Sequence, residues 1–504
     1  MSSMQIEVIN QVSYISKKYQ TIFAHIPIKT DASNSLTSEN LQTLYRILHD
    51  DGVLWICTNI DKKEDVLEAW PLDLSSQLQN SGFFVRNIII WYNKEYESCS
   101  SIFINRYSYL LFVTKRAVGY KFYLDSVREP HIWKEFEWGG GRRNRYNPLG
   151  KNPSNFWIHT SSKLGKTIAH VPLTWEEMVT RCLRSSTMAG SNVLGLVPKG
   201  RDFLTVTKKL DLLADAVELG EEHILPARNE RYKEKIITNR KYRNDELTPI
   251  IYYKSSEEMT EIVDKSIKLA VTSPPYWGLR DYGISSQIGF NESYERYLVR
   301  LQKVLQETYR VLREDGTLWI NINKRIIGGK MLLIPLDIIQ RARAVGFKLI
   351  DILIWFRAIS VPGTGKDNFT DRYEFILLFS KTSNYKIRSL ELKPDFLCEE
   401  TGADINVWKL YRRIGNISDE FKKETKLAIK HTAMFPEELV KRAILSGTNV
   451  GDSVLDPFLG SGTTVAIASR LGRKGIGYEI NRAFEPLIRQ KIYYLGNSLM
   501  RYVG

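Results

Sequence analysis

The chain contains an internal repeat, which constrains the fold because equivalent segments must adopt equivalent structures. Four pairs of segments match in the same order, displaced by 261 to 266 residues. They are HDDGVLWICTN (49–59) with REDGTLWININ (313–323), SGFFVRNIIIWYN (81–93) with VGFKLIDILIWFR (345–357), NRYSYLLFVTK (105–115) with DRYEFILLFSK (371–381), and AHVPLTWEEMVTRCLRSSTMAGSNVL (169–194) with KHTAMFPEELVKRAILSGTNVGDSVL (430–455). Unrelated buried strands would share apolar residues but not a common register. We therefore predict two copies of one fold, within residues 1–200 and 266–504.

Each copy alternates strand-like apolar runs with helical patterns. In the second copy the apolar runs include 267–272, 316–322 and 349–356, which are typical of strands covered on both faces. Residues 293–312 carry apolar side chains at helical spacing, and a further helix is expected over 436–448. Alternation of this kind predicts the α/β class, with a mostly parallel sheet in each copy and helices on both of its faces.

The charge balance favours a polyanionic partner. Lys and Arg number 71 against 57 Asp and Glu, a net charge of +14, and nucleic acid is the commonest partner of so basic a protein. The segment 201–265 is polar and basic, so we expect a linker or a nucleic-acid-contacting insert. The four cysteines lack metal-ligand spacing, and neither a signal peptide nor a membrane-spanning run is recognisable. We expect a cytoplasmic protein without a metal site.

Residues 272–277, TSPPYW, place a rigid turn directly after an apolar strand. Two consecutive prolines end regular structure because each fixes φ and lacks an N–H. The turn carries the hydroxyl of Ser273 on one side and the aromatic ring of Tyr276 on the other. Both side chains are therefore expected at the end of a buried strand.

A glycine-rich loop, DPFLGSGTT (456–464), follows another strand and precedes a helix, which is where α/β sheets bind ligands. It is neither a Walker A loop nor GxGxxG. Asp456 at the strand end suits a cationic or hydroxyl-rich ligand better than a pyrophosphate. Glu479 ends the next apolar strand, where an acid can accept hydrogen bonds from a ribose.

TSPPYW and DPFLGSGTT, in this order, resemble the β class of amino-methylating DNA methyltransferases, which methylate N4 of cytosine or N6 of adenine. HTAMFPEEL (431–439) is similar to the remaining cofactor motif of that class, and RDYG (280–283) also matches. The resemblance covers residues 266–490 and implies two tandem Rossmann-like methyltransferase folds. It also implies S-adenosyl-L-methionine as the cofactor.

The resemblance assigns roles to residues of this chain. The residues expected to bind the cofactor are Phe435, Asp456, Pro457, Phe458, Gly460, Gly462, Thr463, Thr464 and Glu479. The residues expected to act in methyl transfer are Ser273, Pro274, Pro275 and Tyr276.

These assignments agree with the chemistry of methylating an amino group on a base. A base must leave the duplex to reach a methyl donor, and the ring of Tyr276 can stack on it. The hydroxyl of Ser273 and a backbone carbonyl of the turn can accept the amino hydrogens, which orients the nitrogen lone pair. Ser rather than Asp or Asn at position 273 is associated with N4-cytosine in that family.

The first copy has lost these motifs. FAHIPI (23–28) stands where VTSPPY is expected, and NVLGLVPKG (192–200) replaces the acid, the glycine pair and the Thr-Thr of the loop. It keeps a basic stretch, 124–157, resembling a loop that such enzymes carry. We therefore expect a non-catalytic first copy that contacts DNA, although decay without function is the alternative. The residues expected to contact DNA are Arg142, Arg143, Arg145 and Lys151.

The leading hypothesis is a site-specific N4-cytosine methyltransferase of double-stranded DNA, paired with a restriction endonuclease of the same specificity. One alternative changes the methylated base to adenine at N6. Another is a non-catalytic DNA-binding protein built from two degenerate methyltransferase folds. RNA or protein amino groups are a weaker third possibility as substrates.

Overall fold

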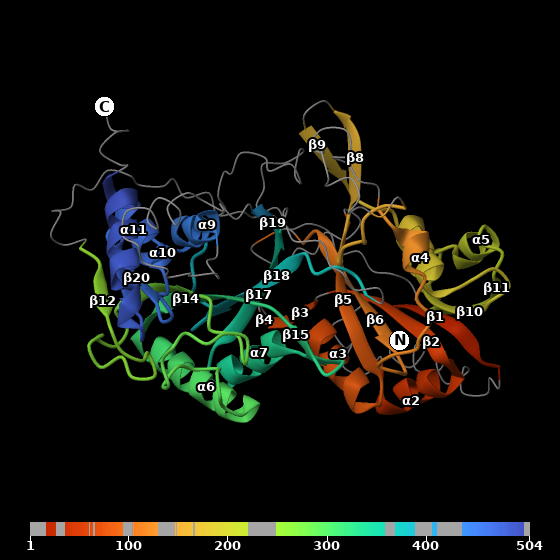
Figure 1. The fold of residues 1–504 in the computed structure, drawn as a ribbon, viewed down its shortest axis with the longest axis horizontal. Coiled ribbons are helices and arrows are strands. Elements are labelled where there is room, and N and C mark those ends of the chain that lie inside the picture. The colour runs from red at the N-terminus through yellow and green to blue at the C-terminus, as the bar shows by residue number, and fades with distance from the viewer. Residues whose placement is uncertain are drawn as a thin grey trace.

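The protein consists of two α/β units, each built around one mixed sheet, that lie side by side (Figure 1). The computed structural model describes residues 17–26, 36–59, 61–63, 66–93, 103, 105–129, 147, 149–164, 167–219, 248–357, 368–388, 406–410 and 436–497. We call the unit that begins at β1 the first copy and the unit that begins at β12 the second copy.

The sheet of the second copy has eight strands in the order β12-β21-β20-β13-β14-β18-β17-β19. All neighbours pair in parallel except β18, which runs antiparallel to both β14 and β17. The strands are β12 (Ile250–Tyr252), β13 (Ile267–Thr272), β14 (Leu312–Ile322), β17 (Lys348–Arg357), β18 (Tyr373–Ser380), β19 (Val407–Leu410), β20 (Ser453–Asp456) and β21 (Lys474–Tyr478).

The sheet of the first copy repeats this arrangement with seven strands in the order β11-β10-β1-β2-β6-β5-β7. Strand β6 is again the antiparallel member. The strands are β1 (Tyr19–Ile26), β2 (Leu48–Thr58), β5 (Phe84–Tyr92), β6 (Tyr107–Thr114), β7 (Phe156–Trp157), β10 (Asn192–Pro198) and β11 (Leu213–Leu219). The predicted α/β class, with mostly parallel sheets, is confirmed.

Within the described residues, three two-stranded hairpins accompany the main sheets. They are β3 (Asp61–Lys63) with β4 (Val66–Glu68), β8 (His159–Leu164) with β9 (Thr167–Val171), and β15 (Arg325–Ile327) with β16 (Lys330–Leu332). The β8–β9 hairpin projects away from the body of the molecule (Figure 1).

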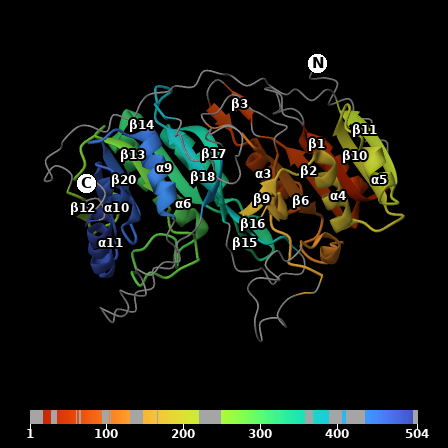
Figure 2. The same ribbon diagram turned by 90° about the horizontal axis from the view of Figure 1, so that it is seen from above.

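Helices cover both faces of the sheets, as Figure 2 shows from a second direction. They are α2 (Ser38–Ile47), α3 (Trp70–Asn80), α4 (Trp175–Ser186), α5 (Phe203–Lys208), α6 (Tyr294–Val311), α7 (Ile334–Val345), α9 (Glu437–Gly447), α10 (Thr463–Arg470) and α11 (Glu485–Asn497). The expected helix over 293–312 is α6, which begins where the Ser293 side chain accepts a hydrogen bond from the backbone N–H of Arg296. None of the helices within the described residues is long and apolar enough to span a bilayer.

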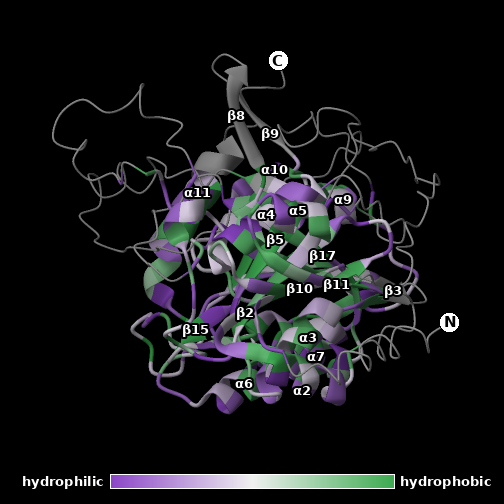
Figure 3. Ribbon diagram, turned by 90° about the vertical axis from the view of Figure 1, so that its right-hand side faces the viewer, coloured by the Kyte–Doolittle hydropathy of each residue, from purple (hydrophilic) through white to green (hydrophobic). Residues whose placement is uncertain are grey.

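Hydrophobic residues are frequent along the inner strands, and hydrophilic residues are frequent along the outer helices (Figure 3). One buried cluster is continuous across the two copies and includes residues of α2, α3, α6 and α7. The opposite faces carry separate clusters, under α4 and α5 in the first copy and under α9 and α10 in the second. A shared apolar cluster favours folding of the two copies as one body.

The boundaries expected for the linker need correction. Residues 203–219 form α5 and β11, and β11 pairs in parallel with β10 in the first sheet. Residues 250–252 form β12, which pairs with β21 in the second sheet. Both ends of the expected linker 201–265 therefore belong to the sheets. The basic composition of this segment concealed two short edge strands, which need few apolar residues.

The copies also exchange aromatic side chains. Phe369 precedes β18 of the second copy, yet it packs in the core of the first copy against Trp55 and Trp157. Phe103 precedes β6 of the first copy and packs in the core of the second copy. The interface is therefore reciprocal, as in a two-fold symmetric dimer.

Candidate active site

The two sequence motifs of the second copy meet at the carboxyl ends of β13 and β20. The chain leaves β13 towards β14 on one side and returns to β20 on the other. Ligands of open α/β sheets bind at such a switch point. A hydrogen bond of 2.7 Å from Thr272 Oγ1 to Asp456 Oδ1 joins the two strand ends.

Helix α6 and a neighbouring hairpin hold the SPPYW turn. The hydroxyl of Tyr297 donates to the carbonyl of Pro275 at 2.9 Å. Trp277 Nε1 donates to the carbonyl of Glu292 at 2.9 Å, and the Arg325 guanidinium donates to the carbonyl of Trp277. These contacts fix the turn through groups other than Ser273 and the carbonyl of Pro274.

Ser273 and Pro274 keep their acceptors available. The Ser273 side chain is half-buried, and its hydroxyl makes no hydrogen bond within the described part of the chain. The Pro275 carbonyl is occupied by Tyr297, whereas the Pro274 carbonyl accepts no hydrogen bond within the described residues. An unpaired hydroxyl beside a carbonyl at a strand end can receive an amino group.

Tyr276 is held at both its ring and its hydroxyl, and the ring packs against the apolar cluster shared by the two copies. Its OH donates to Glu374 Oε2 at 3.1 Å. Burial, together with the carboxylate of Glu374, raises the pKa of Tyr276 well above its ordinary value, so the phenol remains a donor.

Asp456 organises the glycine-rich loop from inside. The side chain is buried, and Oδ1 accepts hydrogen bonds from Thr272 and from the backbone N–H of Phe458. Oδ2 accepts a hydrogen bond of 2.6 Å from Thr464 Oγ1. Burial raises the pKa of Asp456 to about 6, and the three hydrogen bonds oppose that shift. The carboxylate therefore shapes the loop instead of facing solvent.

Glu479 holds the opposite side of the loop and retains capacity to bind. Its Oε2 accepts from the backbone N–H of Gly460 and its Oε1 from that of Asn481, both at 2.8 Å. A carboxylate offers about four lone-pair sites, which is more than these backbone donors use. Burial raises the pKa of Glu479 to about 7.

Gly462 shows why the loop needs glycine. Its φ of 85° lies in the left-handed region, and a Cβ there would also lie 3.1 Å from Ile488 of α11. The half-buried ring of Phe458 lies beside the loop, while Pro457 is buried.

Sequence reasoning missed two residues of this region. Lys491 of α11 is buried and donates to Ser461 Oγ at 2.8 Å and to Thr463 Oγ1 at 2.7 Å. Burial lowers its pKa to about 8. Nothing in the local pattern of α11 distinguishes this lysine. Glu374 could have been noticed in the sequence, because it is an acidic residue inside the apolar run YEFILLFS.

Of the remaining expected residues, the structure describes Lys151 alone. Phe435, Arg142, Arg143 and Arg145 lie outside the described residues. Lys151 lies in the first copy, where its ammonium pairs with Glu129 at 3.1 Å.

The equivalent position of the first copy is filled by an aromatic ring. Gly195 of β10 stands in the register of Asp456, and Phe203 of α5 stands in that of Thr464. A Cβ at Gly195 would lie 2.4 Å from the Phe203 ring. The acid–threonine pair is thus replaced by a ring packed on a glycine.

The Thr464–Asp456 hydrogen bond gives a stability prediction. Thr464→Val keeps the shape of a fully buried side chain and leaves a buried carboxylate oxygen without that donor. The free energy of unfolding in urea should fall by about 1–3 kcal/mol. Ser469→Ala is the control on the same helix, because Ser469 donates only to the Val465 carbonyl, and should cost under about 0.5 kcal/mol. Equal losses in both variants would contradict a special role for the Asp456 pair.

Comparisons with known proteins show which family the chain resembles. Residues 28–195 and 267–490 both match the model of one family, described as DNA methylase and covering N6 and N4 enzymes. The chain is 31% identical over 265 residues to the Type II methyltransferase M.Cfr9I of Citrobacter freundii, covering 47% of this chain and 84% of the relative. It is 29% identical over 273 residues to the Type II methyltransferase M.SmaI of Serratia marcescens, and the match covers 48% of this chain and 90% of the relative.

A solved structure, the PvuII DNA methyltransferase (cytosine-N4-specific), is 23% identical and aligns with a TM-score of 0.40 over 50% of this chain and 92% of its own. The family model spans most of this chain and matches each of the two copies separately. The chain belongs to the N6/N4 family of DNA methylases.

Proposed function

We propose that the protein is a site-specific DNA methyltransferase that transfers a methyl group from S-adenosyl-L-methionine to N4 of cytosine in double-stranded DNA. The observation that carries this proposal is the juxtaposition at β13 and β20 of unpaired amino-group acceptors with a glycine-rich loop. The relatives M.Cfr9I and M.SmaI are named Type II methyltransferases. We extend that class, and with it a partner endonuclease of the same specificity, to this chain.

The loop suits a cofactor that carries hydroxyl groups and a planar base. The carboxylate of Glu479 has more acceptor lone pairs than its backbone donors use, and the remainder could accept ribose hydroxyls. The half-buried ring of Phe458 offers an apolar surface. When bound, S-adenosyl-L-methionine supplies an electrophilic methyl group. Asp456, Thr463 and Thr464 would act indirectly, by fixing the backbone of the loop.

The turn suits an exocyclic amino group. Ser273 Oγ and the Pro274 carbonyl would accept its two hydrogens and direct the nitrogen lone pair away from the ring plane. The same acceptors stabilise the positive charge that develops on nitrogen until a proton leaves. Tyr276 would stack on the flipped base while Glu374 holds its hydroxyl. The serine at position 273 supports cytosine over adenine.

The first copy would contribute to DNA binding rather than to catalysis. Phe203 packs on Gly195 where the second copy has the Thr464–Asp456 pair that shapes its loop. Arg142, Arg143, Arg145 and Lys151 would contact phosphates.

The chemical identity of the product tests the proposal. Duplex DNA incubated with the protein and the cofactor, then digested to nucleosides, should contain N4-methylcytosine. If N6-methyladenine were the only methylated nucleoside, the substrate base would be adenine and not cytosine. The absence of any methylated nucleoside would reject the enzymatic function.

Two substitutions test the assignment of the turn. Ser273→Ala removes one amino-group acceptor and Tyr276→Ala removes the stacking ring, so both should lower turnover about 100-fold or more. Cofactor affinity, measured by calorimetry, should stay within about twofold, because neither side chain forms a hydrogen bond with the glycine-rich loop within the described residues. Loss of cofactor binding equal to the loss of turnover would show that the turn belongs to the cofactor site instead.

A further inference from the structure

The interface between the copies is built from pairs of equivalent contacts. The hydroxyl of Tyr373 in the second copy donates to the Ile88 carbonyl in the first at 2.7 Å. The hydroxyl of Tyr107 in the first copy donates to the Ile352 carbonyl in the second at the same distance. Each copy therefore presents the same groups to the other, as in a symmetric dimer.

Two buried asparagines form the next such pair. Asn155 of the first copy accepts the backbone N–H of Arg372 at 2.8 Å. Asn406 of the second copy accepts the backbone N–H of Arg106 at 3.2 Å. Each also donates from Nδ2 to the residue before that arginine, Asp371 in one case and Asn105 in the other.

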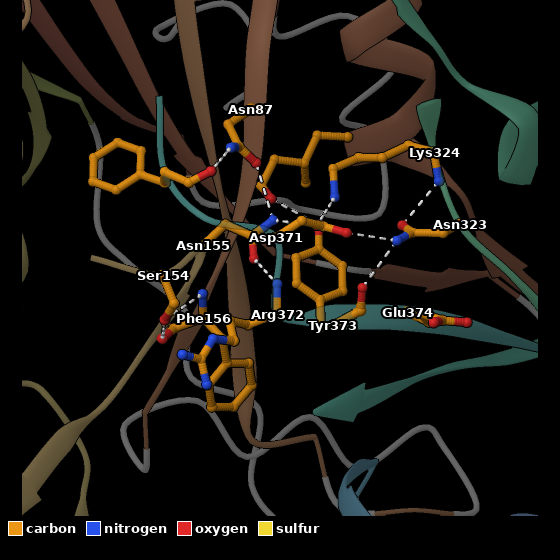
Figure 4. Close-up of polar contacts among 12 residues, drawn as sticks. Asn87, Ser154, Asn155, Phe156, Asn323, Lys324, Asp371, Arg372, Tyr373 and Glu374 are labelled. Carbon is orange, nitrogen blue, oxygen red and sulfur yellow. Dashed lines mark hydrogen bonds and ion pairs between the residues drawn. The ribbon is translucent and has the colours of Figure 1, made fainter. Parts of the chain in front are cut away.

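The symmetry breaks at that last residue. Asp371 is a carboxylate, whereas its counterpart Asn105 is neutral. Asp371 accepts four hydrogen bonds: on Oδ1 from Asn155 at 2.8 Å and Lys324 at 3.0 Å, and on Oδ2 from Asn323 at 2.8 Å and Arg357 at 3.0 Å. Figure 4 shows the Asn155 side chain between Asn87 and Asp371. All acceptor sites of the carboxylate are used, so its orientation is fixed from both copies.

This network leads to the proposed catalytic turn. Arg357 binds Asp371 and also contacts Glu374 Oε1 at 3.4 Å. The other oxygen of the buried Glu374 accepts the hydroxyl of Tyr276.

On the other side of the interface the same positions carry no charge. The counterparts of Arg357 and Glu374 are Asn93 and Ser108, and these two side chains bind each other at 2.9 Å. Of the three charged side chains only Glu374 is buried, whereas Arg357 is half-buried and Asp371 is exposed. A buried charge is costly unless it is paired. This charged set occurs in the copy that keeps the SPPYW turn, while Asn93, Asn105 and Ser108 stand at the equivalent positions of the copy that lost it.

We propose that the first copy completes the methyl-transfer site of the second, with Asn155 as a positioning residue that fixes Asp371, Arg357 and Glu374 behind Tyr276. This inference rests on the proposed function. Asn155 does not touch the reacting groups. It acts by supplying a donor to Asp371, which in turn sets the guanidinium that holds Glu374. The first copy therefore has a role in catalysis without a cofactor site.

Asn155→Ala and Asn406→Ala are a matched pair that separates positioning from stability. Each removes a buried asparagine, one acceptor for an arginine N–H and one Nδ2 donor across the interface. Both should lower the melting temperature of the full chain, and Asn155→Ala should lower it somewhat more because Asn155 Nδ2 also donates to Asn87 Oδ1 within the first copy. Turnover at saturating DNA and cofactor should fall about 10-fold or more in Asn155→Ala only, because small misplacements of positioned groups cost up to about 100-fold. Asn406→Ala should retain turnover within about twofold of wild type.

A double-mutant cycle identifies the route of the effect. Tyr276→Phe keeps the ring and removes the hydroxyl that Glu374 holds. Adding Asn155→Ala to Tyr276→Phe should lower turnover no further, because the shared route is already broken. Independent, multiplicative losses would overturn the proposal. If Asn155→Ala does not fold, Asp371→Asn tests the same link by introducing the residue of the other copy, and unchanged turnover would overturn the proposal.

Turnover of the wild-type protein in the same assay distinguishes a failure of the role of Asn155 from a failure of the proposed methyltransferase function. Equal losses of turnover in Asn155→Ala and Asn406→Ala, with an active wild type, would reject the role of Asn155 and leave the proposed function standing. A wild type that binds DNA but transfers no methyl group would reject the proposed function, and the inference with it.

Discussion

The exchange of Phe103 and Phe369 between the two copies is the contact on which the rest of the structure depends. Phe369 packs against Trp55, Phe112 and Trp157 of the first copy, and Phe103 packs against Trp319 and Trp408 of the second. Burying a phenylalanine side chain contributes about 1.5–3 kcal/mol. Neither core is complete without the side chain of the other copy, so the copies cannot separate without leaving two cavities.

This exchange has a consequence for the active site. Phe369 lies two residues before Asp371 and five before Glu374, so docking of the ring sets the start of β18 against the first copy. Asn155 and Asn87 then contact the same segment through side-chain hydrogen bonds. The strand that carries the partner of Tyr276 is thus held by both copies. A duplicate without its own catalytic motifs has a physical reason to be retained as part of the scaffold.

Much of the fold could be predicted from the sequence, because the internal repeat shows which segments of the two copies are equivalent strands and helices. The apolar runs became β13, β14, β17 and β18, and the acid–glycine pattern became the loop between β20 and α10. The internal position of Asp456 could not be predicted, because a strand-end acid looks the same whether it faces a ligand or a neighbouring threonine. Lys491, Asn155 and the exchanged rings depend on contacts between distant segments, and single residues in polar or aromatic surroundings carry no pattern that marks such contacts.

The central claim is that one copy binds the cofactor while the other supports it. Calorimetric titration of the full chain with S-adenosyl-L-methionine measures this directly, because the stoichiometry reports the number of competent sites. The account predicts one site per chain, since Phe203 packs on Gly195 where the second copy has the Thr464–Asp456 pair. Two sites per chain would contradict it.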